Sequence, residues 1–138
     1  MADQKLYELA GCIIKDEQNR ILLLHRNTEA WQHWEIPGGK IEQNEGAADA
    51  AIREVREELG VDVRITGLIS TKDFKEKDYI VRYSWFSAGI VSGTPQVTET
   101  DTFDGVRYFS QRELISEELL FSNGVKAFLG AQRYEQTI

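Results

Sequence analysis

The chain is poor in the residues on which crosslinked, zinc-binding and membrane proteins depend. Its 138 residues include one cysteine, Cys12, and only two histidines. A lone cysteine forms no internal disulfide and leaves no Cys/His zinc site. The longest apolar run, Ile21 to Leu24, is far shorter than the ~20 residues of a membrane span. The start of the chain has no basic stretch followed by an apolar one, as a secretory signal would. These absences predict a cytoplasmic protein with no membrane partner.

Basic residues are also in the minority, at 16 against 23 acidic ones, for a net charge of −7. A non-specific binder of duplex DNA normally presents a basic face, so this balance argues against a nucleic acid polymer as partner. A phosphate-bearing small molecule remains possible, because carboxylates that first collect divalent metal reverse the local sign of charge. The placement of the acidic residues therefore matters more than their number.

The composition predicts one packed domain over residues 1–138. Hydrophobic residues make up 41% of the chain, and it contains no repeat, linker or low-complexity run. A chain of this length buries roughly two thirds of its unfolded surface, so it needs no crosslink. Nothing in the sequence decides between a monomer and a homodimer.

Apolar runs bounded by turn residues predict the strands. We expect strands at 7–15, 20–26, 34–36, 61–70, 79–91 and 106–109. The first two should form a hairpin over 7–26, and Pro37-Gly38-Gly39 should stop the third. The strand at 79–91 carries aromatic residues on both faces and should be buried on both.

Three helices complete the pattern. The strongest is 46–59, where apolar residues recur at helical spacing and Gly60 supplies the ending. Ser110 and Glu113 form a capping box ahead of a short helix at 111–115, and a last helix spans about 123–134. Along the chain the predicted order is strands, a helix, more strands and then helices. This order favours an α+β or mixed-sheet sandwich over repeating βαβ units.

The helix at 46–59 carries an acidic face. At ~100° per residue, Glu57 and Glu58 flank the direction of Glu54 one turn later. Like charges at this spacing repel, and Arg53 and Arg56 offset only part of the repulsion. Mg²⁺ would offset the rest, because it takes oxygen ligands and shares them with substrate phosphates. The alternative is an ordinary solvated helix face.

The surroundings of this helix favour the metal. The segment Pro37-Gly38-Gly39-Lys40 places bare backbone near the acidic face, where carbonyl oxygens can ligate a cation. Glu45 comes just before the helix, within reach of Arg53 if the loop folds back.

Residues 39–61 read GKIEQNEGAADAAIREVREELGV and resemble the Nudix box, G-x5-E-x7-R-E-U-x-E-E-x-G-U, where U is bulky and aliphatic. Every defined position matches, and these are Gly39, Glu45, Arg53, Glu54, Val55, Glu57, Glu58, Gly60 and Val61. A match this complete is far more specific than a short glycine motif.

The resemblance implies the Nudix fold, an α/β/α sandwich with a mixed central sheet and a catalytic loop–helix–loop. It also implies hydrolysis of a nucleoside diphosphate derivative with Mg²⁺ or Mn²⁺. Glu54, Glu57 and Glu58 would ligate the metal, helped by the Gly38 carbonyl, and Arg53 and Glu45 would tie the loop to the helix. One carboxylate must also take a proton from the attacking water, and the family places that base either in the box or on a distant loop.

Features outside the box resemble the MutT-type nucleoside triphosphate pyrophosphohydrolases. The segment 10–26 is similar to their opening hairpin, and WEIPGGKIE at 34–42 is similar to their glycine loop. Arg26, at a strand end, would then contact phosphate; the alternative is a solvated arginine. Together these features predict cleavage of a nucleoside triphosphate, such as 8-oxo-dGTP, to the monophosphate and pyrophosphate.

Three further residues are candidates by the same resemblance. Glu99, in the segment PQVTE, would be an extra metal ligand, with Asp101 and Asp104 as rivals and a merely polar loop as the alternative. Asn123 would hydrogen-bond a purine base, unless it is only a helix N-cap. Trp31, in a polar loop, is the best tryptophan for stacking on a base.

Other assignments match less well. Enzymes that hydrolyse diadenosine polyphosphates carry a tyrosine near the position of Tyr79, so dinucleoside polyphosphates, along with nucleotide sugars, are the second substrate class. The proline typical of ADP-ribose pyrophosphatases is absent from 74–77. A third hypothesis is a binding module that has lost catalysis, but such a module would have no need for three repelling carboxylates.

Overall fold

The computed structural model describes residues 4–117 and 120–137, and of 133–137 only the backbone course. The strands are β1 (Lys5–Ile14), β2 (Ile21–Asn27), β3 (Gln32–Glu35), β4 (Gly38–Lys40), β5 (Asp62–Glu76), β6 (Tyr79–Ser92) and β7 (Phe103–Phe109). The helices are α1 (Ala47–Leu59), α2 (Gln111–Ser116) and α3 (Asn123–Thr137).

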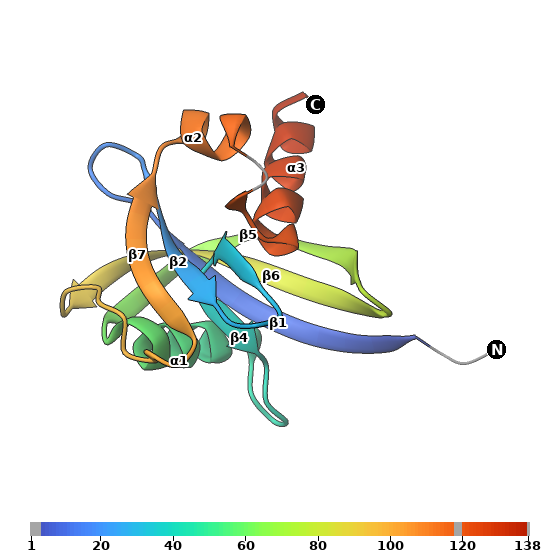
Figure 1. Cartoon of the computed structure of the whole chain (residues 1–138), viewed down its shortest axis with the longest axis horizontal. Coiled ribbons are helices and arrows are strands. Elements are labelled where there is room, and N and C mark those ends of the chain that lie inside the picture. The colour runs from blue at the N-terminus through green and yellow to red at the C-terminus, as the bar shows by residue number, and fades with distance from the viewer. Residues whose placement is uncertain (1–3, 118–119, 138) are drawn as a thin grey trace.

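The strands form two sheets between layers of helix. The larger sheet has the order β4-β1-β6-β5, with β1 parallel to β6 and the other pairs antiparallel. The smaller is the antiparallel sheet β3-β2-β7. Helix α1 lies on one side of the strands, while α2 and α3 lie on the other (Figure 1). The predicted α+β sandwich with a mixed sheet is confirmed.

Two hydrophobic cores, one on each side of the strands, explain the apolar runs in the sequence. In β2, Leu22 and Leu24 join the core beneath α1, whereas Ile21 and Leu23 join the core beneath α3. Successive strand residues point to opposite faces, so a strand covered on both sides is apolar at every position. Cys12 is fully buried beneath α1, and burial raises the pKa of its thiol to about 12, as fits a small core hydrophobe.

The predicted hairpin over 7–26 is wrong. The tight turn is present, since Asp16 accepts hydrogen bonds from the backbone N–H groups of Gln18 and Arg20. Beyond one bridge, Lys15 to Ile21, the two strands separate into different sheets. Strand β1 pairs with β6 along its whole length and with β4 at Leu9–Gly11, whereas β2 pairs with β3 and β7.

Three other strand predictions need correction. The third strand, β3, does end before Pro37, but Gly38 and Gly39 then form a further strand, β4, which is paired to β1. Strand β5 runs on to Glu76 because it pairs with β6 along its whole length. Strand β6 is buried on both faces only around Trp85 and Phe86, one in each core, and its residue Arg82 is exposed.

The helix that carries the acidic face is close to its prediction. Helix α1 begins after Gly46 and ends at Gly60, which has the left-handed φ of 68° that glycine adopts without strain. Ala51, Val55 and Leu59 are fully buried against the sheet. The adjacent side of α1, which carries Glu54 and Glu58, is thereby held against the glycine loop. None of the helices within 4–117 and 120–137 is long and apolar enough to cross a membrane.

Candidate active site

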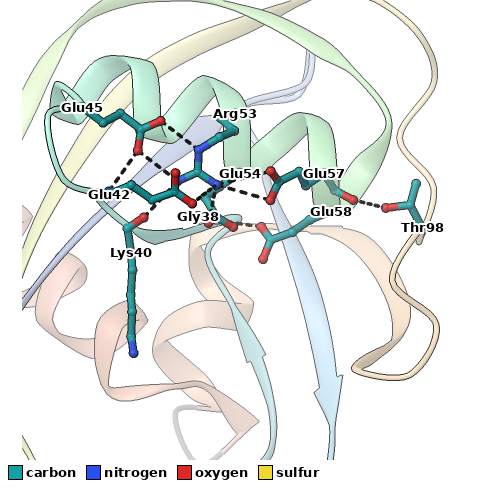
Figure 2. Close-up of polar contacts among 9 residues, drawn as sticks. All are labelled: Gly38, Lys40, Glu42, Glu45, Arg53, Glu54, Glu57, Glu58 and Thr98. Carbon is teal, nitrogen blue, oxygen red and sulfur yellow. Dashed lines mark hydrogen bonds and ion pairs between the residues drawn. The ribbon is translucent and has the colours of Figure 1, made fainter.

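The three box glutamates on α1 have different surroundings. Glu58 is buried, with 3% of its surface exposed, and its Oε1 accepts a hydrogen bond from the Gly38 backbone N–H at 2.9 Å. Glu54 is partly buried, with its carboxylate directly against Gly39. Glu57 is the most exposed of the three. The acidic face is therefore a packed surface against the glycine loop, and Figure 2 shows its side chains beside Gly38.

The two glycines of this loop are required by close packing. A side chain at Gly39 would collide with the Glu54 carboxylate, and one at Gly38 would collide with the backbone of β1 and the Tyr83 hydroxyl. Only glycine allows the loop to approach both α1 and β1 this closely. The predicted proximity of bare backbone to the acidic face is present in the structure.

Arg53 joins the loop to the helix. Its Nε and Nη2 donate to the two oxygens of Glu45 at 2.8 and 3.0 Å, and Nη2 also donates to the Lys40 carbonyl at 3.0 Å. Its Nη1 donates to Glu54 at 3.0 Å and to Glu57 at 3.3 Å. The ion pair expected between Arg53 and Glu45 is thus the centre of a larger network (Figure 2). The guanidinium fixes two of the box glutamates as well as the loop.

The acidic loop before β7 docks on the C-terminal end of α1. The Gln96 and Thr98 backbone N–H groups donate to the carbonyls of Leu59 and Glu58, and the Thr98 hydroxyl donates to that of Glu57. Helix C-terminal carbonyls lack partners within the helix, so these bonds satisfy them. The docking holds Glu99 close enough to act electrostatically on Glu54 and Glu58.

The rival acid Asp104 has other partners. Its carboxylate accepts a hydrogen bond from Asn27 at 2.8 Å and lies 2.6 Å from Nδ1 of His25. Asp101 is exposed. Of the three loop acids, Glu99 is the one whose charge acts on the box glutamates.

Crowding of carboxylates shifts the pKa of two box residues. Burial raises the pKa of Glu54 despite the opposing ion pair with Arg53, and Glu57 and Glu99 raise it further. Burial, followed by the charges of Glu35 and Glu54, raises the pKa of Glu58 well above the ordinary value. Negative charge in this cluster therefore exceeds what its arginine neutralises.

A pocket of about 320 Å³ opens beside the glycine loop. Gly38 and Gly39 lie at one part of its wall, and Trp31, Tyr79 and Asn123 contribute to the rest. The volume is at the lower end of the range for small-molecule sites. Residues from β2, the following loop, β5, β6 and the start of α3 are thus brought to one cavity.

Arg26 lines this pocket, but its guanidinium is already paired. Its Nε and Nη2 donate to the two oxygens of Glu35 at 2.9 and 2.8 Å, and the guanidinium lies over the Phe103 ring. Glu35 also lies 2.8 Å from Nε2 of His33. Burial by itself would raise the pKa of Glu35, but the hydrogen bonds from His33 and Arg26 lower it. Arg26 is therefore a fixed, half-buried side chain, and the alternative of a solvated arginine is wrong.

Asn123 is not the N-cap of α3. Ser122 is the cap, because its hydroxyl accepts from the Val125 N–H at 3.2 Å and its carbonyl accepts from the Lys126 N–H at 3.1 Å. Asn123 instead donates from Nδ2 to Glu76 at 2.9 Å. Trp31 is half-buried, with the Lys77 ammonium 4.9 Å from its ring centre. Both candidate base-binding residues therefore contact the tip of the β5–β6 hairpin.

The donor set suits Mg²⁺ in its chemistry. Carboxylates and a backbone carbonyl are the hard oxygen ligands that Mg²⁺ takes. Within the described part of the chain, no three acidic, histidine or cysteine side chains already converge as a metal cage. Glu54 and Glu57 turn toward Arg53 instead. Mg²⁺ commonly takes only one or two carboxylates besides phosphate and water, so these residues fit the ion without a preformed cage.

Comparison with known proteins agrees with this geometry. The family model described as the NUDIX domain matches residues 7–129. The chain belongs to the Nudix family. A curated relative, the 8-oxo-dGTP diphosphatase of Proteus vulgaris, is 34% identical over 88 residues, which is 62% of this chain and 79% of the relative. The CTP pyrophosphohydrolase of Escherichia coli is 30% identical over 97 residues, covering 69% and 71%.

The fold of this Nudix protein matches a solved MutT structure from end to end. The MutT protein from Methanosarcina mazei Go1 superposes with a TM-score of 0.83 over all of both chains, at 20% identity. As a member of the family, the protein is a hydrolase of pyrophosphate bonds. Nudix hydrolases generally use divalent metal ions.

The sequence reasoning missed several residues of this Nudix site. Glu35 and His33 hold Arg26 from within the strand ahead of the glycine loop, and Tyr83 packs its ring beneath Gly38. Glu35 lies within the segment 34–42, which is similar to the MutT glycine loop, so this similarity could have identified Glu35 as a site residue. The contact of Glu76 with Asn123 joins residues 47 positions apart and left no local signal.

Proposed function

We propose that the protein is a MutT-type pyrophosphohydrolase that converts a nucleoside triphosphate to its monophosphate and pyrophosphate with Mg²⁺ or Mn²⁺. The observation that carries this proposal is the continuity of the pocket. One cavity joins Trp31 and Asn123, which suit a base, to Gly38 and Gly39, which lie against the acidic face. Purine nucleotides, including 8-oxo-dGTP, are the proposed substrates, in line with the activity named for the Proteus vulgaris relative.

Each site residue has a distinct task in this proposal. Glu54, Glu57 and Glu58 hold the metal, with Glu99 from the docked loop and the carbonyl of Gly38. A bound divalent ion neutralises phosphate oxygens and makes water more acidic. Arg53 and Glu45 keep the loop against the helix, so the glycine backbone stays in place. Positioning and neutralisation of charge account for most of phosphoryl transfer, and this network supplies the positioning.

Arg26 is proposed to contact a phosphate with the part of its guanidinium not used by Glu35. A guanidinium has five N–H donors, and the contacts to Glu35 use one from Nε and one from Nη2. Trp31 would stack on the base, and Asn123 would hydrogen-bond its edge. Gly39 would let the phosphate chain approach the backbone closely.

The test is a screen of nucleotides in which phosphate and pyrophosphate are detected separately. We expect purine triphosphates to give a monophosphate and pyrophosphate in equal amounts, and no free phosphate. Release of phosphate alone would contradict the proposal. Faster turnover of diadenosine tetraphosphate than of any triphosphate would favour the second substrate class, for which the placement of Tyr79 in the pocket wall is the supporting observation.

A further inference from the structure

The tip of the β5–β6 hairpin touches both side chains that are proposed to bind the base. Glu76, the last residue of β5, accepts the Asn123 hydrogen bond from the start of α3. Lys77, the next residue, places its ammonium over the ring of Trp31. Lys77 has a left-handed φ of 47°, which marks the tight turn into β6. The hairpin tip therefore bridges two segments of the pocket wall that are far apart in the sequence.

The contact with Glu76 fixes which way the Asn123 amide faces. An amide has an NH₂ group that donates and an oxygen that accepts, whereas a carboxylate has only acceptor oxygens. The group that points at Glu76 must therefore be the NH₂ of Asn123. The Asn123 amide oxygen then faces away from Glu76 and can accept a hydrogen bond from a ligand, while the NH₂ group keeps one further N–H.

Glu76 itself lines the pocket beside Asn123. Its carboxylate adds acceptor oxygens next to the amide oxygen of Asn123, so this part of the wall presents acceptors side by side. A base that meets such a wall is favoured if its edge carries adjacent N–H donors. A base whose edge places a ring-nitrogen acceptor there is repelled.

Among the common bases, guanine has the matching edge. Its N1–H and N2 amino group are adjacent donors. Adenine has one amino group beside the N1 acceptor, and cytosine has one beside the N3 acceptor. Uracil has a single N–H between two carbonyls. Hypoxanthine keeps the N1–H of guanine and lacks the amino group.

We propose that Glu76 is a specificity-determining residue, which orients Asn123 and with it selects bases that present adjacent N–H donors, as guanine does. This inference rests on the proposed function, because it assigns the base of that substrate. It makes no distinction between guanine and 8-oxoguanine, which share this edge.

The experiment compares kcat and KM for GTP, ITP and ATP in the wild type and in Glu76→Gln. For the wild type we expect kcat/KM to fall from GTP to ITP to ATP. In Glu76→Gln the amide can donate to the Asn123 oxygen, so Asn123 is free to reverse. We expect the GTP-to-ATP ratio of kcat/KM to fall about tenfold, as for the loss of one hydrogen bond, through KM and with kcat within about twofold.

Asp78→Asn is the matched control, because it makes the same change of charge in the same exposed turn. It should leave the GTP-to-ATP ratio unchanged. Glu76→Ala is a second variant, in case the glutamine still accepts from Asn123, and it should lower the ratio at least as much. A wild-type preference for ATP or a pyrimidine triphosphate, or an unchanged ratio in both Glu76 variants, would overturn the assignment.

Calorimetric binding of GMP and AMP separates this inference from the proposed function. If no triphosphate is hydrolysed, the proposed function fails. The base assignment would still be supported if wild type binds GMP more tightly than AMP and Glu76→Gln loses this difference. Equal binding of the two monophosphates, or binding of neither, would reject it.

Discussion

At the scale of single residues, the site depends on carboxylates that differ in exposure although they share one helix face. Glu58 is buried and hydrogen-bonded to the glycine loop, while Glu57 is exposed and held only by Arg53 among the contacts described. A substitution at Glu57 can therefore remove a proposed metal ligand without disturbing the core.

Glu57→Gln should lower kcat by at least ~10²-fold, the size expected when stabilisation of developing charge is lost. The melting temperature should stay the same or rise slightly, because one repelling charge is removed from the acidic face. Steady-state kinetics and thermal unfolding measure the two effects. Glu42→Gln is the matched control, since Glu42 is an exposed carboxylate 3.8 Å from Arg53. Activity of Glu57→Gln within threefold of wild type would refute its role as a ligand.

Ser122 and Asn123 are neighbours with separable roles. Asn123→Ala should raise KM for GTP much more than for pyrimidine triphosphates, because it removes a contact to the guanine base. Ser122→Ala should lower the free energy of unfolding by ~1 kcal/mol, because it removes the cap of α3. Chemical denaturation and a panel of four triphosphates measure both quantities. If Asn123→Ala lost stability and left the ratio of KM for GTP to KM for pyrimidine triphosphates unchanged, these separate roles of Ser122 and Asn123 would be contradicted.

At the scale of elements, the site is assembled by tying two loops to α1. The loop before α1 is held through Arg53 and Glu45, and the loop before β7 is held through the last carbonyls of the helix. Each tie makes a prediction of its own.

The tie through Glu45 should weaken in acid. The hydrogen bonds from Arg53, followed by that from the Glu42 N–H, lower the pKa of Glu45 from 4.5 to about 2. A carboxylate whose pKa is lowered by folding stabilises the folded state. This contribution is fully present when the pH is above the ordinary pKa of 4.5, and it is lost as the pH falls toward 2. Wild type should therefore exceed Glu45→Gln in melting temperature at pH 7, and the difference should shrink between pH 4.5 and 2. A constant difference across that window would count against the ion pair as its source.

The tie through the second loop should make Glu99 the acid that matters for turnover. Glu99→Gln should reduce kcat by at least about tenfold, as for loss of one charge-stabilising group. Asp101→Asn and Asp104→Asn should have much smaller effects, because Asp104 is bonded to Asn27 and His25. Steady-state kinetics on the three variants test this prediction. If kcat fell more in Asp104→Asn than in Glu99→Gln, Asp104 would replace Glu99 as the proposed metal ligand of this segment.

At the scale of the whole molecule, catalysis and stability should both respond to divalent metal. Burial, and after it the charges of neighbouring carboxylates, raises the pKa of Glu54 and Glu58, and a cation bound among them would favour their charged forms. We expect EDTA to abolish turnover and Mg²⁺ or Mn²⁺ to restore it. A ligand that binds only the folded state at about 100 times its Kd adds about 2.7 kcal/mol of stability. Melting in EDTA and in excess Mg²⁺ should therefore differ by several degrees, and full turnover in chelator would exclude the metal requirement.

The box was recognisable in the sequence because its chemistry is local. Glu54, Glu57 and Glu58 share a face because of helical spacing alone. Gly60 ends the helix through its own left-handed backbone conformation, which is also a local property. The apolar stripe on the opposite side fixed which face would turn toward the sheet. The family and the kind of bond that it cleaves follow from these residues.

The strand pairing was decided by tertiary structure. The turn at 16–19 is local and was predicted, but the partners of β1 lie at 38–40 and 79–88. No periodicity distinguishes a hairpin from two strands in separate sheets, because the stretches nearest the turn, 10–14 and 21–24, have no polar side chain to alternate with the apolar ones. The division of their side chains between two cores settled the pairing.

The base-binding end of the pocket likewise exists only in the folded chain. Trp31, Glu76 and Asn123 come from three separate segments. The sequence indicated Trp31 and Asn123 as candidates for the base, but nothing in it indicated Glu76. The hydrogen bond between Glu76 and Asn123 shows that Asn123 is no cap and which way its amide faces. The chemistry of the acidic helix follows from residue spacing within one element and is therefore readable in the chain. The surroundings of the proposed base site depend on residues that the sheet and α3 bring together, so they follow from the fold alone.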